Sequence, residues 1–166
     1  QLAERIQKAL ADSALVDRCR NDAGRYLKKG VTELATGREY VDRAFVLSEV
    51  FRQIMEEAGT DAITVHHCMG TIMDVSKTTA CLPLSLLNDD GYMAFCESDF
   101  VVIPSGILLK GISGNPVFLN DPTYPHHGVV TLAHCTAPRR MDGRSNERTA
   151  LLTHFESDYG VAPKVE

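Results

Sequence analysis

Two carboxylates, Glu97 and Asp121, directly follow two apolar runs that are typical of buried β-strands. The runs are residues 92–96 and 116–120, and residues 100–113 between them are apolar with helical spacing. This order predicts a strand–helix–strand unit with parallel strands and a right-handed crossover. Parallel neighbours lie about 4.8 Å apart, and ligands bind beyond their carboxyl ends. The two acids could therefore share one divalent cation, which prefers hard carboxylate oxygens.

The same acids also have an ordinary structural interpretation. Glu97, Ser98 and Asp99 all precede the predicted helix. Acidic and hydroxyl side chains at such positions commonly cap a helix by accepting hydrogen bonds from its first backbone N–H groups. The residues alone therefore leave two interpretations open, a helix cap and metal-assisted catalysis.

Cysteines and histidines form a second set of candidates. No two of the five cysteines are spaced as Cys-x-x-Cys, and His134 directly precedes Cys135. Neighbours on a strand point to opposite faces, so adjacent residues do not readily bind one zinc ion, and buried cysteines acting as small apolar residues are favoured. A cysteine nucleophile at Cys96 or Cys135, paired with a histidine, is the alternative. For His134, a structural hydrogen bond and a role beside the two acids are both open.

Length and composition restrict the class of protein. The chain has 166 residues, 44% of them hydrophobic, which is enough to bury the core of one globular domain. A net charge of −5 without basic clusters argues against a nucleic-acid partner, and no apolar stretch reaches the ~18 residues of a membrane span. Five cysteines, an odd number without paired spacing, predict a reducing, cytoplasmic location.

The elements that would position these residues fall into three stretches. Residues 1–58 are expected to be mostly helical because their apolar residues recur at amphipathic spacing. Residues 59–138 alternate between strands and helices, so we predict an α/β domain over residues 1–138 with a mainly parallel sheet of at least four strands flanked by helices. Residues 139–166 are expected to be a linker and the start of a truncated C-terminal domain. The strands expected in the second stretch are residues 62–66, 92–96, 116–120 and 129–133, with helices at 82–87 and 101–112.

Several blocks of the chain, in order, resemble the L-fucose isomerase-like family of ketol isomerases. They are residues 81–91 (CLPLSLLNDDG), 95–99 (FCESD), 108–121 (LLKGISGNPVFLND) and 134–138 (HCTAP). The likeness is greatest to poorly characterised bacterial members that carry a Cys-Glu-x-Asp version of the motif. It covers residues 61–138 and, more loosely, the helices before them.

The resemblance implies a metal-dependent function. In that family a Glu and an Asp at the places of Glu97 and Asp121 bind Mn²⁺ and act as acid and base, while a C-terminal domain supplies a histidine ligand. The implied reaction interconverts an aldose and a ketose, both free sugars, through a cis-enediol. The family enzymes have three domains and form trimers or hexamers. We therefore expect the chain to be a Rossmann-like middle-domain fragment of a homo-oligomeric isomerase, inactive or nearly so when isolated.

Two departures from the family pattern keep an alternative function open. The motif here reads Cys-Glu-Ser-Asp where fucose isomerases have Thr-Glu-Asn-Asp, and Asp121 is followed by Pro-Thr-Tyr in place of Val-Arg-Thr-Tyr. The alternative is a non-catalytic α/β module that binds a sugar or a partner and has lost the chemistry. The identity of the sugar and the residues that bind it stay open.

Overall fold

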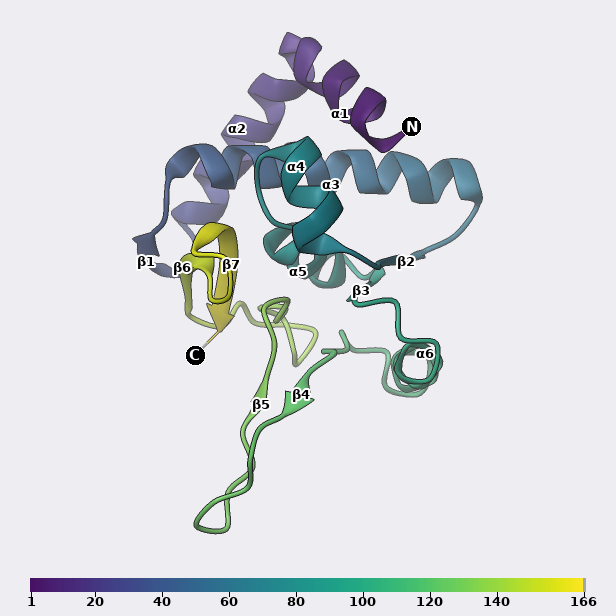
Figure 1. The fold of residues 1–166 in the computed structure, drawn as a ribbon, viewed down its shortest axis with the longest axis vertical. Coiled ribbons are helices and arrows are strands. Elements are labelled where there is room, and N and C mark those ends of the chain that lie inside the picture. Colours follow the sequence, from purple (N-terminus) through teal and green to yellow (C-terminus); the bar gives the residue numbers. More distant parts are fainter. Residues whose placement is uncertain (166) are drawn as a thin grey trace.

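The computed structural model describes residues 1–165, which form a mixed α/β fold (Figure 1). Three helices, α1 (Leu2–Ala11), α2 (Ser13–Leu27) and α3 (Arg38–Ala58), form a layer above three small sheets. No helix in this part of the chain is both long and apolar enough to cross a membrane. The remaining elements are β1 (Val31–Ala35), β2 (Ala62–Val65), the π-helical turn η1 (Cys68–Ile72), α4 (Met73–Ser76), α5 (Cys81–Asp89), β3 (Met93–Cys96), α6 (Val102–Ser113), β4 (Asp121–Pro122), β5 (Leu132–Ala133), β6 (Thr149–His154) and β7 (Tyr159–Val165).

The helical layer follows from local signals in the sequence. Asp12 caps α2 by accepting a hydrogen bond from the backbone N–H of Leu15 at 3.0 Å. Gly59 ends α3 in the left-handed conformation, with φ of 65°. One face of α3 is buried, including Val41, Leu47 and Val50, as the amphipathic spacing predicts. The prediction that residues 1–58 are mostly helical is confirmed, and only the short strand β1 was not foreseen.

Helix α5 joins the two main parts of the hydrophobic core. All its residues from Cys81 to Asn88 are buried, so it is apolar all round, unlike a surface helix. Leu84 and Leu87 pack in the cluster formed with α1 and α3, whereas Leu82 packs in the cluster that contains Leu151 of β6. The helix therefore connects the N-terminal layer to the C-terminal strands.

The strand–helix–strand unit expected over residues 92–120 does not form, because residues 116–120 are not a strand; the strands expected at 62–66 and 92–96 are present as β2 and β3, on either side of α5. Strands β2 and β3 pair in parallel, with Ala62 opposite Met93 and Val65 opposite Cys96. Strand β1 pairs in parallel with β6, which pairs antiparallel with β7. Strands β4 and β5 form a separate antiparallel hairpin that projects from the rest of the molecule (Figure 1).

The strand pattern expected beyond β3 is wrong in two places. Residues 116–120 form no strand, and Asp121 instead begins the two-residue strand β4. The strand expected at residues 129–133 is reduced to the exposed pair Leu132–Ala133. An apolar run alone does not distinguish a sheet strand from extended chain packed on a core. Among residues 1–165, the four-stranded parallel sheet expected for residues 60–135 is therefore absent, and the parallel pairing in that range is confined to β2 and β3.

Strands β6 and β7 pack into the hydrophobic core. Leu151 and Val161 are fully buried. Thr79 donates to the carbonyl of Val161 at 2.7 Å and accepts from its N–H at 3.1 Å. Gly160 has φ of 67°, and a Cβ there would lie 2.6 Å from Thr79 Cγ2, so the close approach requires glycine. The domain division at residue 138 stays a prediction.

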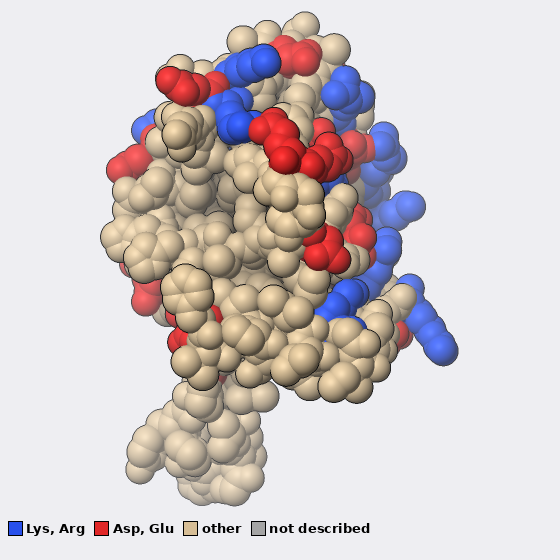
Figure 2. Space-filling model, turned by 90° about the vertical axis from the view of Figure 1, so that its right-hand side faces the viewer, with Lys and Arg blue, Asp and Glu red and all other residues tan. Residues whose placement is uncertain are grey.

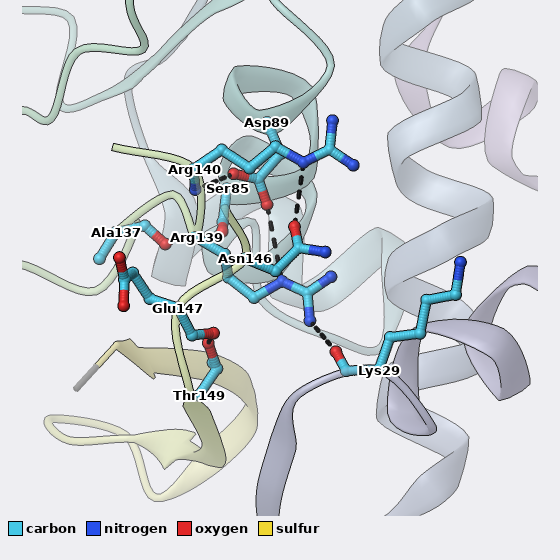
Figure 3. A network of polar contacts seen from close by, with 9 residues as sticks. All are labelled: Lys29, Ser85, Asp89, Ala137, Arg139, Arg140, Asn146, Glu147 and Thr149. Carbon is cyan, nitrogen blue, oxygen red and sulfur yellow. Dashed lines mark hydrogen bonds and ion pairs between the residues drawn. The ribbon is translucent and has the colours of Figure 1, made fainter. Parts of the chain in front are cut away.

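A buried arginine anchors the loop that precedes β6. The Arg139 guanidinium donates to the carbonyl of Lys29 at 2.7 Å and has Nε 3.7 Å from Asp89 Oδ2 (Figure 3). It also lies 3.7 Å from the ring centroid of Tyr26. The side chains of Arg139 and Asp89 are both only 7% exposed. Burial raises the pKa of Asp89, although the backbone N–H of Arg140 and the charge of Arg139 oppose the shift.

Replacement of Arg139 should therefore destabilise the fold. Arg139→Ala leaves Asp89 buried without its cation and is expected to lower the free energy of unfolding by about 3 kcal/mol in urea denaturation. Arg140→Ala is the matched control, because that side chain is exposed, and it should cost less than about 1 kcal/mol. Equal losses in the two variants would show that the buried pair has no special role.

Candidate metal and acid–base site

A cavity of about 1090 Å³ lies between the end of β3, the β4–β5 hairpin, η1 and the ends of β6 and β7. Glu97 and Asp121, the two predicted site residues, both line it. The sequence predicted that they would meet as the ends of neighbouring parallel strands. They instead reach one cavity from β3 and from the projecting hairpin. The other lining residues able to bind a metal or transfer a proton include His66, Cys68, Cys96, His134, Cys135 and His154.

Glu97 is held by backbone geometry that is unfavourable for its residue type. Its N–H donates to the carbonyl of Val65 at 2.7 Å and so extends the β2–β3 pairing by one residue. Glu97 and Ser98 then adopt φ of 72° and 44°, the left-handed region that residues other than glycine rarely occupy. The Ser98 N–H donates to Thr64 Oγ1 at 3.1 Å, which fixes the turn. Conformations of this kind cluster at functional sites.

His134 is the side chain closest to the Glu97 carboxylate in the hydrogen-bond network. Its Nε2 lies 3.4 Å from Glu97 Oε1 and its Nδ1 lies 3.2 Å from Thr136 Oγ1. The ligand atoms of Cys96, Glu97 and His134 all lie within 4.8 Å of one another. The His134 side chain is 6% exposed and that of Glu97 is 58% exposed, so the histidine forms the wall and the carboxylate faces the cavity.

The hairpin brings Asp121 towards His134. In the β4–β5 register Asp121 lies opposite Ala133, the residue that directly precedes His134. Asp121 is exposed and stands outside the three-residue cluster of Cys96, Glu97 and His134. It is therefore a further carboxylate that lines the same cavity.

The helix-cap interpretation applies to Asp99 and not to Glu97. Asp99 Oδ1 accepts hydrogen bonds from the backbone N–H groups of Val101 and Val102, at 2.7 and 2.8 Å. These bonds to the start of α6 lower the pKa of Asp99. Glu97 is left to point into the cavity.

A second cluster lies on the buried side of the cavity. The ligand atoms of Cys81, Cys135 and His154 lie within 4.8 Å of one another, and the Cys68 thiol accepts a hydrogen bond at 3.3 Å from the N–H of Ala80, the residue before Cys81. Sequence spacing does not reveal this cluster, because its members come from separate segments of the chain without motif spacing. His134 and Cys135, adjacent in the chain, belong to different clusters.

The two cysteines considered as nucleophiles have different environments. Burial, with smaller contributions from the charges of Cys135 and Cys68, raises the pKa of Cys96 to about 12, so Cys96 stays a thiol. The hydrogen bond with Cys81, together with His134 and His154, lowers the pKa of Cys135 despite its burial. Cys135 Sγ lies 3.7 Å from His134 Nδ1. Burial lowers the pKa of His134 and is the largest single effect. The hydrogen bonds and charges of Cys135 and Glu97 together outweigh it and raise this pKa to about 9.

A scan against protein-family models and a search of curated proteins return no match to this chain. The resemblance to L-fucose isomerase-like enzymes therefore stays a prediction from the motif blocks. The arguments for a function rest on the cavity and on the side chains that line it.

The strained turn at Glu97 can be tested through stability. A non-glycine residue in the left-handed region costs roughly 1–2 kcal/mol, partly offset in a glycine variant by the greater chain entropy of the unfolded state. Glu97→Gly should therefore unfold with a free energy about 0.5–1 kcal/mol higher than Glu97→Ala. Both variants lack the carboxylate, so urea denaturation of the pair isolates the backbone effect. Equal stability would mean that the turn stores no strain.

Proposed function

We propose that this chain carries the metal-binding and acid–base residues of a Mn²⁺-dependent ketol isomerase, which interconverts an aldose and a ketose through a cis-enediol. One observation carries the proposal. Glu97 and Asp121, the two residues singled out by sequence, line one cavity although they come from different sheets, and His134 lies 3.4 Å from Glu97. The motif blocks supply the class of reaction.

The donor atoms of these side chains suit a divalent ion of intermediate hardness, and Asp121, which stands outside the cluster of Cys96, Glu97 and His134, would have to approach that cluster to share the ion. Glu97 and Asp121 would supply carboxylate oxygens and His134 an imidazole nitrogen, a mixture that favours Mn²⁺ over metals that require thiolates. When bound, such an ion acts as a Lewis acid for two neighbouring oxygens of the sugar. Thr136 Oγ1, 3.2 Å from Nδ1 of His134, orients the ring so that Nε2 faces Glu97.

The two carboxylates can divide the proton transfer between them. Isomerisation requires removal of a proton from one carbon and return of a proton to its neighbour. Glu97 enters the cavity from the end of β3 and Asp121 from the hairpin, so a sugar between them would meet a carboxylate from each element. The 58% exposure of Glu97 leaves this site open to water. Because water competes for the charged intermediate, we expect slow turnover by the 166-residue chain alone.

The homo-oligomer and the Rossmann-like core implied by the resemblance belong to the same proposal. The β2–α5–β3 unit supports the Rossmann-like core, since its two strands are parallel as that architecture requires. Helix α6 supports the homo-oligomer, because none of its residues is buried and it exposes Leu108, Leu109 and Ile112. Figure 2 shows that charged side chains gather over the upper part of the molecule, which carries helices α1 to α3, and are scarce on the β4–β5 hairpin at the bottom of the view. Exposed apolar faces of this kind are typical of contacts between subunits.

Two other functions make different predictions. A non-catalytic sugar-binding module would keep the cavity and bind no stoichiometric metal. A cysteine-dependent enzyme would use Cys135, which is supported by the His134 imidazole between Cys135 and Glu97. Cys135 is only 9% exposed, so its sulfur is poorly placed to attack a substrate. Loss of Mn²⁺-dependent exchange in a Glu97 variant together with its retention in Cys135→Ser would favour the isomerase.

Mn²⁺ binding and proton exchange test the proposal directly. We expect Glu97→Gln and Asp121→Asn each to weaken Mn²⁺ binding, measured by electron paramagnetic resonance, by at least about tenfold, since loss of even a supporting residue of a metal site costs that much. The same variants should abolish Mn²⁺-dependent incorporation of solvent deuterium at C2 of an aldose.

The control for these variants is Asp99→Asn. Asp99 is an exposed carboxylate two residues from Glu97 that caps α6, and asparagine retains the cap. It should bind Mn²⁺ as the unmodified chain does. Unchanged Mn²⁺ affinity in both Glu97→Gln and Asp121→Asn would contradict the proposed site.

A further inference from the structure

We propose that Cys68, Cys81, Cys135 and His154 form a second metal site, a structural centre for Zn²⁺ or another divalent ion that prefers thiolates. The site lies on the buried side of the cavity and is independent of the proposed isomerase function. Its donors are three sulfurs and one imidazole, whereas the first site offers mainly carboxylates. The two sites would therefore select different metals.

Four elements converge on this cluster. Cys68 is the first residue of η1 and Cys81 the first residue of α5, while His154 is the last residue of β6 and Cys135 lies in the loop after β5. Cys81, Cys135 and His154 are 1%, 9% and 5% exposed. A metal ion bound by these side chains would cross-link segments that are far apart in the sequence.

The spacing of the donor atoms suits a tetrahedral ion. The two sulfurs of Cys81 and Cys135 and a ring nitrogen of His154 lie within 4.8 Å of one another. Zn–S bonds of about 2.3 Å in a tetrahedron place sulfurs roughly 3.8 Å apart, so the side chains need only a small inward movement. Cys68 lies outside this 4.8 Å group, but its Sγ accepts a hydrogen bond at 3.3 Å from the N–H of Ala80, the residue before Cys81, so a turn of its side chain would supply the fourth donor. Three cysteines and a histidine are a common donor set of closed, structural zinc sites.

Neighbouring groups already orient two of the donors. The backbone N–H of Ala80 lies 3.3 Å from Cys68 Sγ and donates to it, which stabilises a thiolate. Ser157 Oγ lies 3.3 Å from His154 Nδ1, which leaves the other ring nitrogen available as a ligand. Outer contacts of this type hold metal ligands in position.

Simple burial of small apolar residues accounts for Cys19 and not for this cluster. Cys19 lies in the core cluster among residues such as Ile6, Leu15 and Val50. Cys81 and Cys135 instead share their buried position with an imidazole, which a purely apolar role would not require. Cys19 is therefore a suitable control cysteine for experiments on the cluster.

The proposal is tested by cobalt spectroscopy of the full chain, purified under reducing conditions. Co²⁺ bound by thiolates gives a near-ultraviolet sulfur-to-metal charge-transfer band, which carboxylate sites do not give. We expect one equivalent of Co²⁺ to produce this band and Zn²⁺, but not Mn²⁺, to remove it. Cys81→Ser should weaken Co²⁺ binding by at least about tenfold, since loss of a supporting residue already costs that much. Cys19→Ser and Glu97→Gln should retain the band.

Two results would overturn this site. The first is the absence of a thiolate band in the unmodified chain, a result that does not depend on how any variant folds. The second is a shortfall of two thiols, among the five cysteines of the chain, when the chelator-treated protein is unfolded and titrated, because that would indicate a disulfide. Cys81→Ala, with circular dichroism beside each titration, distinguishes loss of a ligand from loss of the fold.

Discussion

The buried guanidinium of Arg139 fixes the loop on which both candidate sites depend. A charge with 7% exposure needs partners, and Arg139 has the Tyr26 ring from α2, the Lys29 carbonyl just after α2 and the Asp89 carboxylate from α5. The loop is also held by Ser85, which donates to the carbonyl of Ala137 at 2.7 Å (Figure 3). Because His134 and Cys135 directly precede these contacts, their backbone is tied to the core, although the adjoining hairpin projects away from it.

The cavity is assembled from elements that do not share a sheet. Glu97 is positioned by the β2–β3 pair, His134 and Asp121 by the hairpin, and His154 by β6. The strained turn at Glu97 and Ser98 directs the carboxylate into the cavity and leaves the helix cap to Asp99. His134 contributes to one wall and Cys135 to the other, so one dipeptide links the carboxylate site to the thiol cluster.

Local signals explain what the sequence predicted, and long-range contacts explain what it did not. The mostly helical character of residues 1–58, helices α5 and α6, and strands β2 and β3 were predicted because amphipathic spacing and short apolar runs are local. The pairing of β1 with β6 joins residues more than a hundred positions apart, and no pattern within either strand indicates the partner. Residues 116–120 were predicted as a strand because an apolar run does not reveal whether a neighbouring strand exists. The carboxylates were found because each follows such a run, whereas the thiol cluster has no sequence spacing to reveal it.

The central claim is that Glu97, Asp121 and His134 hold one metal ion in this cavity, and anomalous diffraction from crystals equilibrated with Mn²⁺ tests it most directly. The account predicts an anomalous peak within bonding distance of a carboxylate oxygen of Glu97, an oxygen of Asp121 and the Nε2 atom of His134. A peak bound only by the thiol cluster, or none in the cavity at saturating Mn²⁺, would contradict it.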